Sequence, residues 1–321
     1  MKLIIQIPCY NEEATLPRTL AELPASIGGV DEVEVLVVND GSTDGTVEAA
    51  RRGGVRHIVS FTANQGLAKA FTAGLEASLR AGADIIVNTD ADNQYRGEDI
   101  PRLIRPILDG EAEIVIGARP IEDIQHFSRL KKLLQRLGSW VLRRASGTDI
   151  PDSPSGFRAF SREAALKLNV FNEYTYTLET IIQAGLKGIP ITWTPVRTNP
   201  PTRPSRLVKS IGSYVWRSVI TIIRIFVLYR PLEFFWTLSV FPIVAGAGLM
   251  LRWLLLYLLA DPTRARAPSL IVAAVLLILG ALGLVIGLIC DLLAANRKLL
   301  EEIQLRLRRQ DIERGQGDRR P

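Results

Sequence analysis

Two long uncharged stretches in the C-terminal half of the chain constrain its fold most strongly. Residues 234–251 contain no charged side chain, and residues 267–290 form a second uncharged stretch of 24 residues. Crossing the hydrocarbon core of a membrane takes roughly 20 residues of helix. A pair of buried helices in a soluble core is the alternative, but helices of this length and apolarity favour the membrane. The sequence therefore predicts two transmembrane helices, at about residues 233–260 and 267–290.

Only residues 261–266 separate these stretches, so the two predicted helices form a hairpin with both ends on one side of the membrane. Basic residues flank the hairpin, whereas its loop carries two arginines opposed by Asp261. Because basic residues concentrate on the cytoplasmic side, we expect cytoplasmic termini, in the membrane of a prokaryotic cell. Arg252 would extend its side chain to the far interface. The flanking basic residues are Arg203, Arg206, Lys209, Arg217, Arg224 and Arg230 before the hairpin and Arg297, Lys298, Arg306, Arg308 and Arg309 after it.

The segment just before the hairpin combines an apolar face with a polar stripe. Lys209, Arg217 and Arg224 recur at helical spacing within residues 206–231. This pattern is typical of a helix that lies in the membrane interface and contacts anionic lipid. A third transmembrane helix is the alternative, but it would bury two arginines. We expect an interfacial amphipathic helix here.

Short apolar segments rich in Val and Ile alternate with helical patterns in the N-terminal half. This alternation predicts βαβ units and a mainly parallel sheet. No Gly-x-Gly-x-x-Gly follows the first strand and no phosphate-binding P-loop motif occurs, which disfavours dinucleotide-binding and P-loop proteins. The predicted strands cover residues 3–8, 33–39, 55–61, 84–90 and 112–119, and the predicted helices cover 14–23, 46–52, 67–81 and 100–108.

Polar clusters follow several predicted strands, at the edge where α/β sheets bind ligands. After the fourth strand come Asp90 and Asp92, which would share one face of an extended chain, and Gln94 lies two residues further on. Hard divalent ions such as Mg²⁺ or Mn²⁺ bind one or two carboxylates and complete their shell with substrate phosphates. A solvated turn is the alternative, but the polarity recurs at one edge. The pattern predicts a site for a metal and a diphosphate.

The net charge of +6 and the pI of about 9.5 could indicate nucleic-acid binding. However, the excess charge lies beside the membrane segments, and no basic patch is interleaved with aromatic residues. We therefore expect phosphates and lipid headgroups as partners, and no nucleic acid. Cys9 and Cys290 belong to different modules, so no disulfide is expected.

The chain resembles family 2 glycosyltransferases, which have the GT-A fold, in residues 7–13 (IPCYNEE), 38–46 (VNDGSTDGT) and 90–94 (DADNQ). Residues 155–160 (SGFRAF), together with the two-helix C-terminus, resemble polyprenyl-phosphate glycosyltransferases of the dolichyl-phosphate mannose synthase type. The resemblance covers residues 1–230 by motif. It implies a GT-A catalytic domain over residues 1–205, followed by the interfacial segment, a transmembrane region at 232–291 and a helical and disordered tail at 292–321. The residues after Gln310 are polar and charged, and we expect disorder there.

The resemblance also implies site residues for the donor, a nucleoside-diphosphate sugar carrying uracil or guanine. Asp90 would contact both donor and metal, and Asp92 would be catalytic through the metal. Asp40 would accept a hydrogen bond from a base N–H, although capping the following helix is its alternative role. The implied donor-binding residues are Pro8, Tyr10, Glu12, Asp40, Lys69 and Asp90, and the implied ligands for Mg²⁺ or Mn²⁺ are Asp90, Asp92 and Gln94.

For the acceptor, the resemblance implies a polyprenyl monophosphate bound by guanidinium groups, which match phosphate oxygens well. Arg119 and Arg203 would act directly in catalysis, whereas Arg158 could instead form a salt bridge with Asp152. The implied acceptor-phosphate residues are Arg119, Arg129, Lys132, Arg158, Arg203 and Arg206.

A phosphate acceptor already carries an anionic oxygen and needs no general base, so in-line attack would invert the anomeric centre. An enzyme that glycosylates a lipid or glycan hydroxyl would need a base, for which Asp149, Asp152 and Glu179 are available. A non-catalytic membrane scaffold is the third possibility, and the retained carboxylates disfavour it. The apolar spacing of residues 292–307 leaves a homo-oligomer open.

Overall fold

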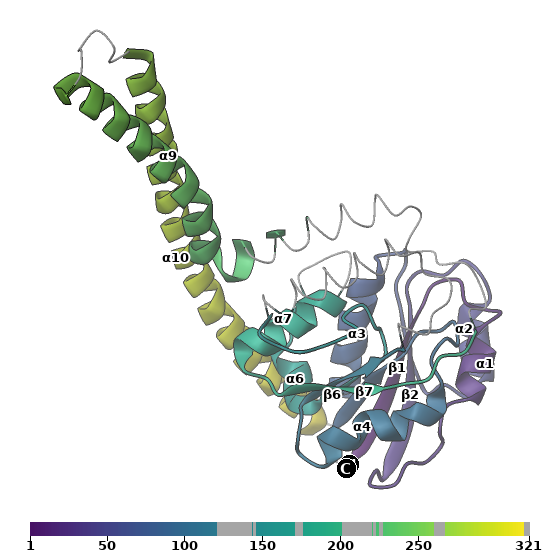
Figure 1. Cartoon of the computed structure of the whole chain (residues 1–321). Helices are drawn as coiled ribbons and strands as arrows, with labels where there is room; N and C mark the ends of the chain where they lie inside the picture. The colour runs from purple at the N-terminus through teal and green to yellow at the C-terminus, as the bar shows by residue number, and fades with distance from the viewer. Residues whose placement is uncertain are drawn as a thin grey trace. The chain divides into compact units, whose positions relative to one another are not determined.

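The computed structural model describes residues 1–120, 143, 146–170, 176–200, 220, 223–224, 227–259 and 267–317 (Figure 1). The chain divides into two compact units. Unit 1 comprises Met1–Val215 with Gln304–Pro321, and unit 2 comprises Trp216–Ile303. Most of the predicted interfacial helix, residues 206–231, lies outside the described residues.

Unit 1 contains a seven-stranded sheet with the order β3-β2-β1-β4-β6-β5-β7. All described neighbours are parallel except β6, which runs antiparallel to both β4 and β5. The mainly parallel α/β sheet predicted from the sequence is thus confirmed. The strands are β1 (Lys2–Cys9), β2 (Glu32–Asn39), β3 (His57–Ser60), β4 (Ile85–Asn88), β5 (Ile114–Ala118), β6 (Arg158–Ser161) and β7 (Ile191–Pro195).

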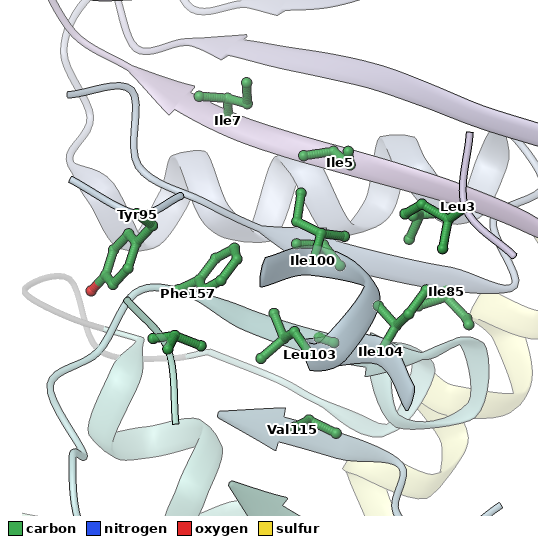
Figure 2. Close-up of a cluster of buried hydrophobic side chains, with 14 of the residues drawn as sticks. Leu3, Ile5, Ile7, Ile85, Tyr95, Ile100, Leu103, Ile104, Val115 and Phe157 are labelled. Carbon is green, nitrogen blue, oxygen red and sulfur yellow. The ribbon is translucent and has the colours of Figure 1, made fainter. Parts of the chain in front are cut away.

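Helices cover both faces of this sheet. Alternate residues of β1 point to opposite faces of the sheet. Leu3 and Ile5 pack in one buried cluster (Figure 2), whereas Ile4 packs in the other. The first cluster includes residues of α1, α2 and α4, and the second includes residues of α3, α6 and α7. The helices are α1 (Leu16–Ala21), α2 (Thr46–Arg52), α3 (Leu67–Arg80), α4 (Ile100–Leu108, preceded by the 3₁₀ turn η1, Gly97–Asp99), α6 (Arg162–Lys167) and α7 (Thr177–Lys187).

All five predicted strands and all four predicted N-terminal helices occur, and none of their ends is shifted by more than two residues. The fourth strand shows the shift that matters most for the site. It was predicted to run from residue 84 to residue 90, but β4 ends at Asn88. The sequence analysis did not identify β6 or β7, which are only four and five residues long.

Unit 2 contains two long helices, α9 (Pro231–Leu259) and the first part of α10 (Ala267–Gly317). Both are long and apolar enough to cross a membrane. Glycines bring the two helices close together: a Cβ at Gly287 would lie 2.8 Å from the Cβ of Phe235, and one at Gly246 would lie 2.9 Å from the carbonyl oxygen of Ala273. Other apolar side chains point outward, and Phe241 is 78% exposed. Small residues at helix contacts and apolar residues outside are typical of membrane helices.

The end of α10 belongs to unit 1. Ile312 is buried in the cluster that also contains Leu166, and a guanidinium nitrogen of Arg308 donates to the carbonyl oxygen of Leu168 at 3.3 Å. The sequence analysis predicted disorder after residue 310, and this was wrong for residues 311–317, which continue the helix. The tail is polar, but a few apolar side chains suffice to dock it.

Candidate active site

The two carboxylates that follow β4 lie on a turn. Asp90 and Asp92 are both half-buried. The backbone N–H of Gln94 donates to Oδ1 of Asp92 at 3.2 Å. Asn93 has a left-handed backbone with φ of 57°, which Asn tolerates better than most residues. Contrary to the prediction from the sequence, Asp90 and Asp92 therefore do not lie on an extended strand, although both follow β4.

Asp90 lies directly against Gly156. A Cβ at Gly156 would be 2.9 Å from Oδ1 of Asp90, so any larger residue would displace the carboxylate. The backbone N–H of Gly156 donates to the Tyr95 hydroxyl at 3.2 Å, and Asn88 donates to the Gly156 carbonyl at 2.8 Å. Burial raises the pKa of Tyr95 to about 12, so its hydroxyl stays neutral. These neutral groups hold Gly156 in place against the Asp90 carboxylate.

Arg119, the first residue after β5, is oriented by a buried carboxylate. Its Nε and Nη2 donate to Oδ2 and Oδ1 of Asp152 at 2.7 and 2.9 Å, and its backbone N–H donates to Oδ2 at 3.1 Å. Asp152 is fully buried, whereas the Arg119 side chain is 24% exposed. Burial opposes the charge of Arg119, but Tyr95, Asp152 and Asp90 together raise its pKa. Arg119 is therefore a fixed cation within electrostatic reach of Asp90.

Arg158 lies in the interior, and its assignment to an acceptor phosphate is corrected. The residue is fully buried, and burial lowers its pKa to about 10. Its guanidinium donates to the carbonyl oxygens of Ser153, Ser155 and Thr177 at 2.6 to 2.7 Å, and to the Thr180 hydroxyl at 2.6 Å. The alternative salt bridge to Asp152 is not formed either, because Asp152 pairs with Arg119. Arg158 instead shapes the loop that leads to Gly156.

The predicted donor residues at the end of β1 differ in exposure. Tyr10 is 40% exposed, whereas Glu12 is 7% exposed, and Pro8 is half-buried within β1. Oε2 of Glu12 accepts a hydrogen bond from the Thr15 hydroxyl at 2.7 Å. Tyr10 is thus accessible to a ligand at the sheet edge, and Glu12 is held in a fixed orientation beside it.

Asp40, at the end of β2, binds the loop before α3. Its Oδ1 and Oδ2 accept from the backbone N–H groups of Gln65 and Gly66 at 2.7 and 2.9 Å. Asp40 therefore supports the start of α3. It does not cap α2, which is the next helix along the chain. Each carboxylate oxygen can accept a second hydrogen bond, so contact with a nucleoside base stays a prediction. Lys69 is exposed in the first turn of α3.

Sequence reasoning missed three polar residues around the Asp92 turn. Asn93 and Asn199 both donate to the carboxylate of Glu22, at 2.9 and 3.3 Å. Glu22 follows α1, and Asn199 follows β7, so their proximity depends on the tertiary fold. The only local signal is that Asn93 lies inside the quoted DADNQ motif.

The remaining predicted residues, Arg129, Lys132, Arg203 and Arg206, lie outside the described residues. Within the described part of the chain, no group of three or more His, Cys, Asp and Glu side chains is placed to hold a metal. A metal at Asp90 and Asp92 would need further ligands. An amide oxygen, substrate phosphates and water are the usual ones for Mg²⁺ or Mn²⁺.

The mainly parallel sheet, with carboxylates and an oriented arginine after its strands, is that of an α/β protein, and its structural neighbours have a GT-A-like fold. Residues 4–168 match the family model Glycosyl transferase family 2. The chain belongs to that family and is a glycosyltransferase.

Similar proteins are named for related reactions. An undecaprenyl-phosphate mannosyltransferase from Micrococcus luteus is 35% identical over 50% of this chain and 66% of its own length. A UDP-N-acetylglucosamine–dolichyl-phosphate N-acetylglucosaminyltransferase from Methanococcus voltae is 30% identical over 60% of this chain and 83% of its own. The structure of glucosyl-3-phosphoglycerate synthase from Mycobacterium tuberculosis with Mn²⁺, uridine diphosphate and glucosyl-3-phosphoglycerate has a TM-score of 0.51, at 25% identity, covering 69% of this chain and 79% of that one.

Proposed function

We propose that this glycosyltransferase transfers a sugar from a nucleoside-diphosphate sugar to a membrane polyprenyl monophosphate, with inversion at the anomeric carbon. The observation that carries the proposal is Arg119, whose guanidinium is oriented by two hydrogen bonds to the buried carboxylate of Asp152. A fixed cation within electrostatic reach of Asp90 suits an anionic acceptor that must approach a diphosphate. Relatives named for transfer to undecaprenyl and dolichyl phosphate support the same acceptor class.

The residues present fit a divalent metal. Asp90 and Asp92 are carboxylates on one short turn, and Gly156 leaves room for the Asp90 side chain. Asp90, Asp92 and Gln94 would hold Mg²⁺ or Mn²⁺, in keeping with the Mn²⁺ and uridine diphosphate bound by a structural neighbour. A bound divalent ion would neutralise charge on the departing nucleoside diphosphate.

For the donor, the end of β1 supplies an exposed aromatic residue, Tyr10, beside the fixed carboxylate of Glu12. We assign these residues, with Pro8, Asp40 and Lys69, to the nucleoside and its diphosphate. The donor is a UDP- or GDP-sugar.

For the acceptor, Arg119 would bind the polyprenyl phosphate and aim its oxygen at the anomeric carbon. The Asp152 carboxylate fixes the guanidinium before substrate arrives, so little rotamer entropy is lost on binding. The predicted cations Arg129, Lys132, Arg203 and Arg206 would complete the phosphate site. Because the phosphate oxygen is already ionised, the reaction needs no proton acceptor on the protein.

The alternative, transfer to a hydroxyl, requires a carboxylate base, and the three candidates fit that role poorly. Asp152 is fully buried and is the counterion of Arg119. Glu179 is 3% exposed, and Asp149 lies on the surface, 3.2 Å from Arg143. A general base must reach the acceptor hydroxyl, and a carboxylate that is buried or paired with a guanidinium is poorly placed to do so.

Nucleoside diphosphate release by the purified protein tests the proposal. UDP- and GDP-sugars would be supplied one at a time with Mg²⁺ or Mn²⁺, with polyprenyl phosphate, with polyprenol, or without lipid. We expect release only with polyprenyl phosphate, and the active donor would identify the base. Release with polyprenol but not with its phosphate would instead support a hydroxyl acceptor, and no release with any donor would contradict a catalytic role.

A further inference from the structure

The chain that leaves β7 runs alongside the turn that carries Asp92 and Gln94. Thr198 forms an isolated antiparallel bridge with Tyr95. The backbone N–H of Asn199 donates to the Gln94 carbonyl at 2.8 Å, and its side-chain Nδ2 donates to the Asn93 carbonyl at 3.0 Å. Asn199 therefore holds the backbone of two consecutive residues of the turn.

Glu22 closes the same network from the other side. Its Oε1 accepts from Nδ2 of Asn93 at 2.9 Å, and its Oε2 accepts from Nδ2 of Asn199 at 3.3 Å. The Oδ1 of Asn199 in turn accepts from Nε of Arg96 at 3.1 Å. The backbone of Glu22 approaches Gly97 so closely that a Cβ at Gly97 would collide with the Glu22 carbonyl. One carboxylate thus ties the turn to the end of α1.

Glu22 and Asn199 both contact Asn93, which lies between the predicted metal ligands Asp92 and Gln94. Asn93 is 2% exposed and has the left-handed backbone that reverses the chain between Asp92 and Gln94. Neither Glu22 nor Asn199 belongs to the motifs that the family resemblance singled out. Their contacts restrain the turn from outside it, as outer residues restrain the ligands of many metal sites.

We propose that Glu22 and Asn199 are positioning residues, which hold the Asp92–Gln94 turn in the conformation that binds the metal and the nucleoside diphosphate. This inference rests on the proposed function, because it assumes that the turn binds a metal. It adds two residues, one after α1 and one after β7, to the machinery of the site.

The hydrogen-bond polarity of the network gives a sharp test. In Asn199→Asp, a carboxylate replaces the amide donor and faces both Oε2 of Glu22 and the Asn93 carbonyl, so attraction becomes repulsion. In the double variant with Glu22→Gln, the introduced amide can donate to the new carboxylate at position 199 while its oxygen still accepts from Asn93. The repulsion from the Asn93 carbonyl remains, so we expect a partial rescue.

Binding of Mn²⁺ to the full-length protein would be measured from the electron paramagnetic resonance signal of unbound Mn²⁺, with UDP or GDP present and no sugar or lipid. We expect Asn199→Asp to weaken Mn²⁺ binding by about 10-fold or more, the range usual for residues that orient metal ligands. Adding Glu22→Gln should recover part of this loss.

Ser161→Ala is the matched control. The Ser161 hydroxyl accepts from the backbone N–H of Ala164 at 3.0 Å and caps α6, away from the turn, so its loss should lower stability but not Mn²⁺ affinity. Wild-type affinity in Asn199→Asp, or an equal loss in Ser161→Ala, would overturn the inference while leaving the proposed function standing. Failure of the wild-type protein to bind Mn²⁺ with either nucleotide would overturn the inference together with the assignment of Mn²⁺ to this turn, whereas the lipid-dependent release assay tests the proposed function separately.

Discussion

Arg158 and Asp152 are charged residues that the protein buries completely. Each is compensated in a different way. Asp152 has a charged partner, Arg119, whereas three backbone carbonyls and one hydroxyl surround the Arg158 guanidinium. Burial of a charge is costly unless its hydrogen bonds are satisfied. The loop between Asp152 and Gly156 therefore depends on Arg158 for its shape, and Arg119 depends on Asp152 for its orientation.

Replacing Arg158 with Met should destabilise the protein strongly. The carbonyl oxygens of Ser153 and Ser155 would lose the guanidinium donor that they share, at a cost of roughly 3 kcal/mol or more in the free energy of unfolding. The thermal midpoint in detergent measures this loss. Arg105→Met is the control, because Arg105 is 70% exposed in its pair with Asp109, and such pairs contribute little. Equal midpoints for the two variants would show that Arg158 is not structural.

Asp92→Asn should abolish sugar transfer and leave the protein folded. The substitution keeps the size of the side chain but removes one of the two carboxylate charges that follow β4, which a divalent ion requires. Lipid-dependent nucleoside diphosphate release and the thermal midpoint would be measured together. Glu98→Gln, at a carboxylate that is 73% exposed, should retain activity. Near-normal turnover of Asp92→Asn would contradict the metal assignment.

Residue identity and order could predict that Tyr10, Asp90 and Asp92 follow the ends of strands, because short motifs at strand ends carry their own signal. Their roles in binding stay predictions. The roles of Arg158 and Asn199 could not be predicted in this way. A guanidinium suits a phosphate and a set of carbonyls equally well, and only the packing of α7 and the 153–155 loop decides between them. Asn199 lies 106 residues from the Asn93 carbonyl it binds, and no local pattern encodes such a contact.

Among the elements, β1, β2 and α3 could be predicted because each has a clear period and enough length. β6 and β7 are short, and the antiparallel direction of β6 depends on the pairing of distant strands. The boundary of β4 was missed because alternation of polarity continues into the turn. The local sequence cannot distinguish an extended Asp-x-Asp from a turn that is stabilised by contacts with Glu22 and Asn199.

The far end of the sheet contains a charge cluster whose effect depends on pH. Oε2 of Glu34, on β2, lies 2.6 Å from Nζ of Lys2 and 2.9 Å from Nε2 of His57, and Arg56 pairs with its other oxygen. Burial opposes the charged form, but these partners prevail and lower the pKa of Glu34 to about 2. A depressed pKa stabilises the fold above the unfolded value, and this contribution is lost as pH falls towards the folded value.

Glu34→Gln should therefore lower stability by roughly 2–3 kcal/mol at neutral pH. The difference from the wild-type protein should shrink as pH falls from about 4.5 towards 2, because the wild-type carboxylate is then protonated. Denaturant midpoints of both proteins across this range measure the effect. A difference that stayed constant with pH would show that the charge of Glu34 does not contribute to stability.

A further prediction concerns the end of α10, which packs in unit 1. Ile312 is 4% exposed in the cluster with α3 and α6, so Ile312→Ala should reduce the free energy of unfolding by about 2 kcal/mol. Leu307, on the same helix, is 55% exposed, and Leu307→Ala is the matched control with little expected effect. The thermal midpoint would be compared between the two. Equal midpoints would mean that this end of α10 does not pack against unit 1 in solution.

At the scale of the whole molecule, α10 belongs to both compact units. Its first part lies with α9 in unit 2, and residues from Gln304 onward belong to unit 1.

Both ends of the chain belong to unit 1, and the basic residues that flank the two apolar helices predict that this side is cytoplasmic. Both termini should lie in the cytoplasm and residues 261–266 on the opposite side. Single cysteines introduced as Ala265→Cys and Gln310→Cys, in a Cys290→Ser background, would be exposed to a membrane-impermeant maleimide in intact cells. Cys9 should not be labelled by the maleimide, because it is 2% exposed and burial raises the pKa of its thiol.

We expect the maleimide to label Ala265→Cys in intact cells, and Gln310→Cys only after the cells are permeabilised. The physical basis is the excess of basic residues on the segments that flank the two helices, which resist translocation. The reverse pattern would place the site outside the cell, where nucleotide sugars are not made. Labelling of both positions in intact cells would mean that α9 and α10 do not form a transmembrane hairpin.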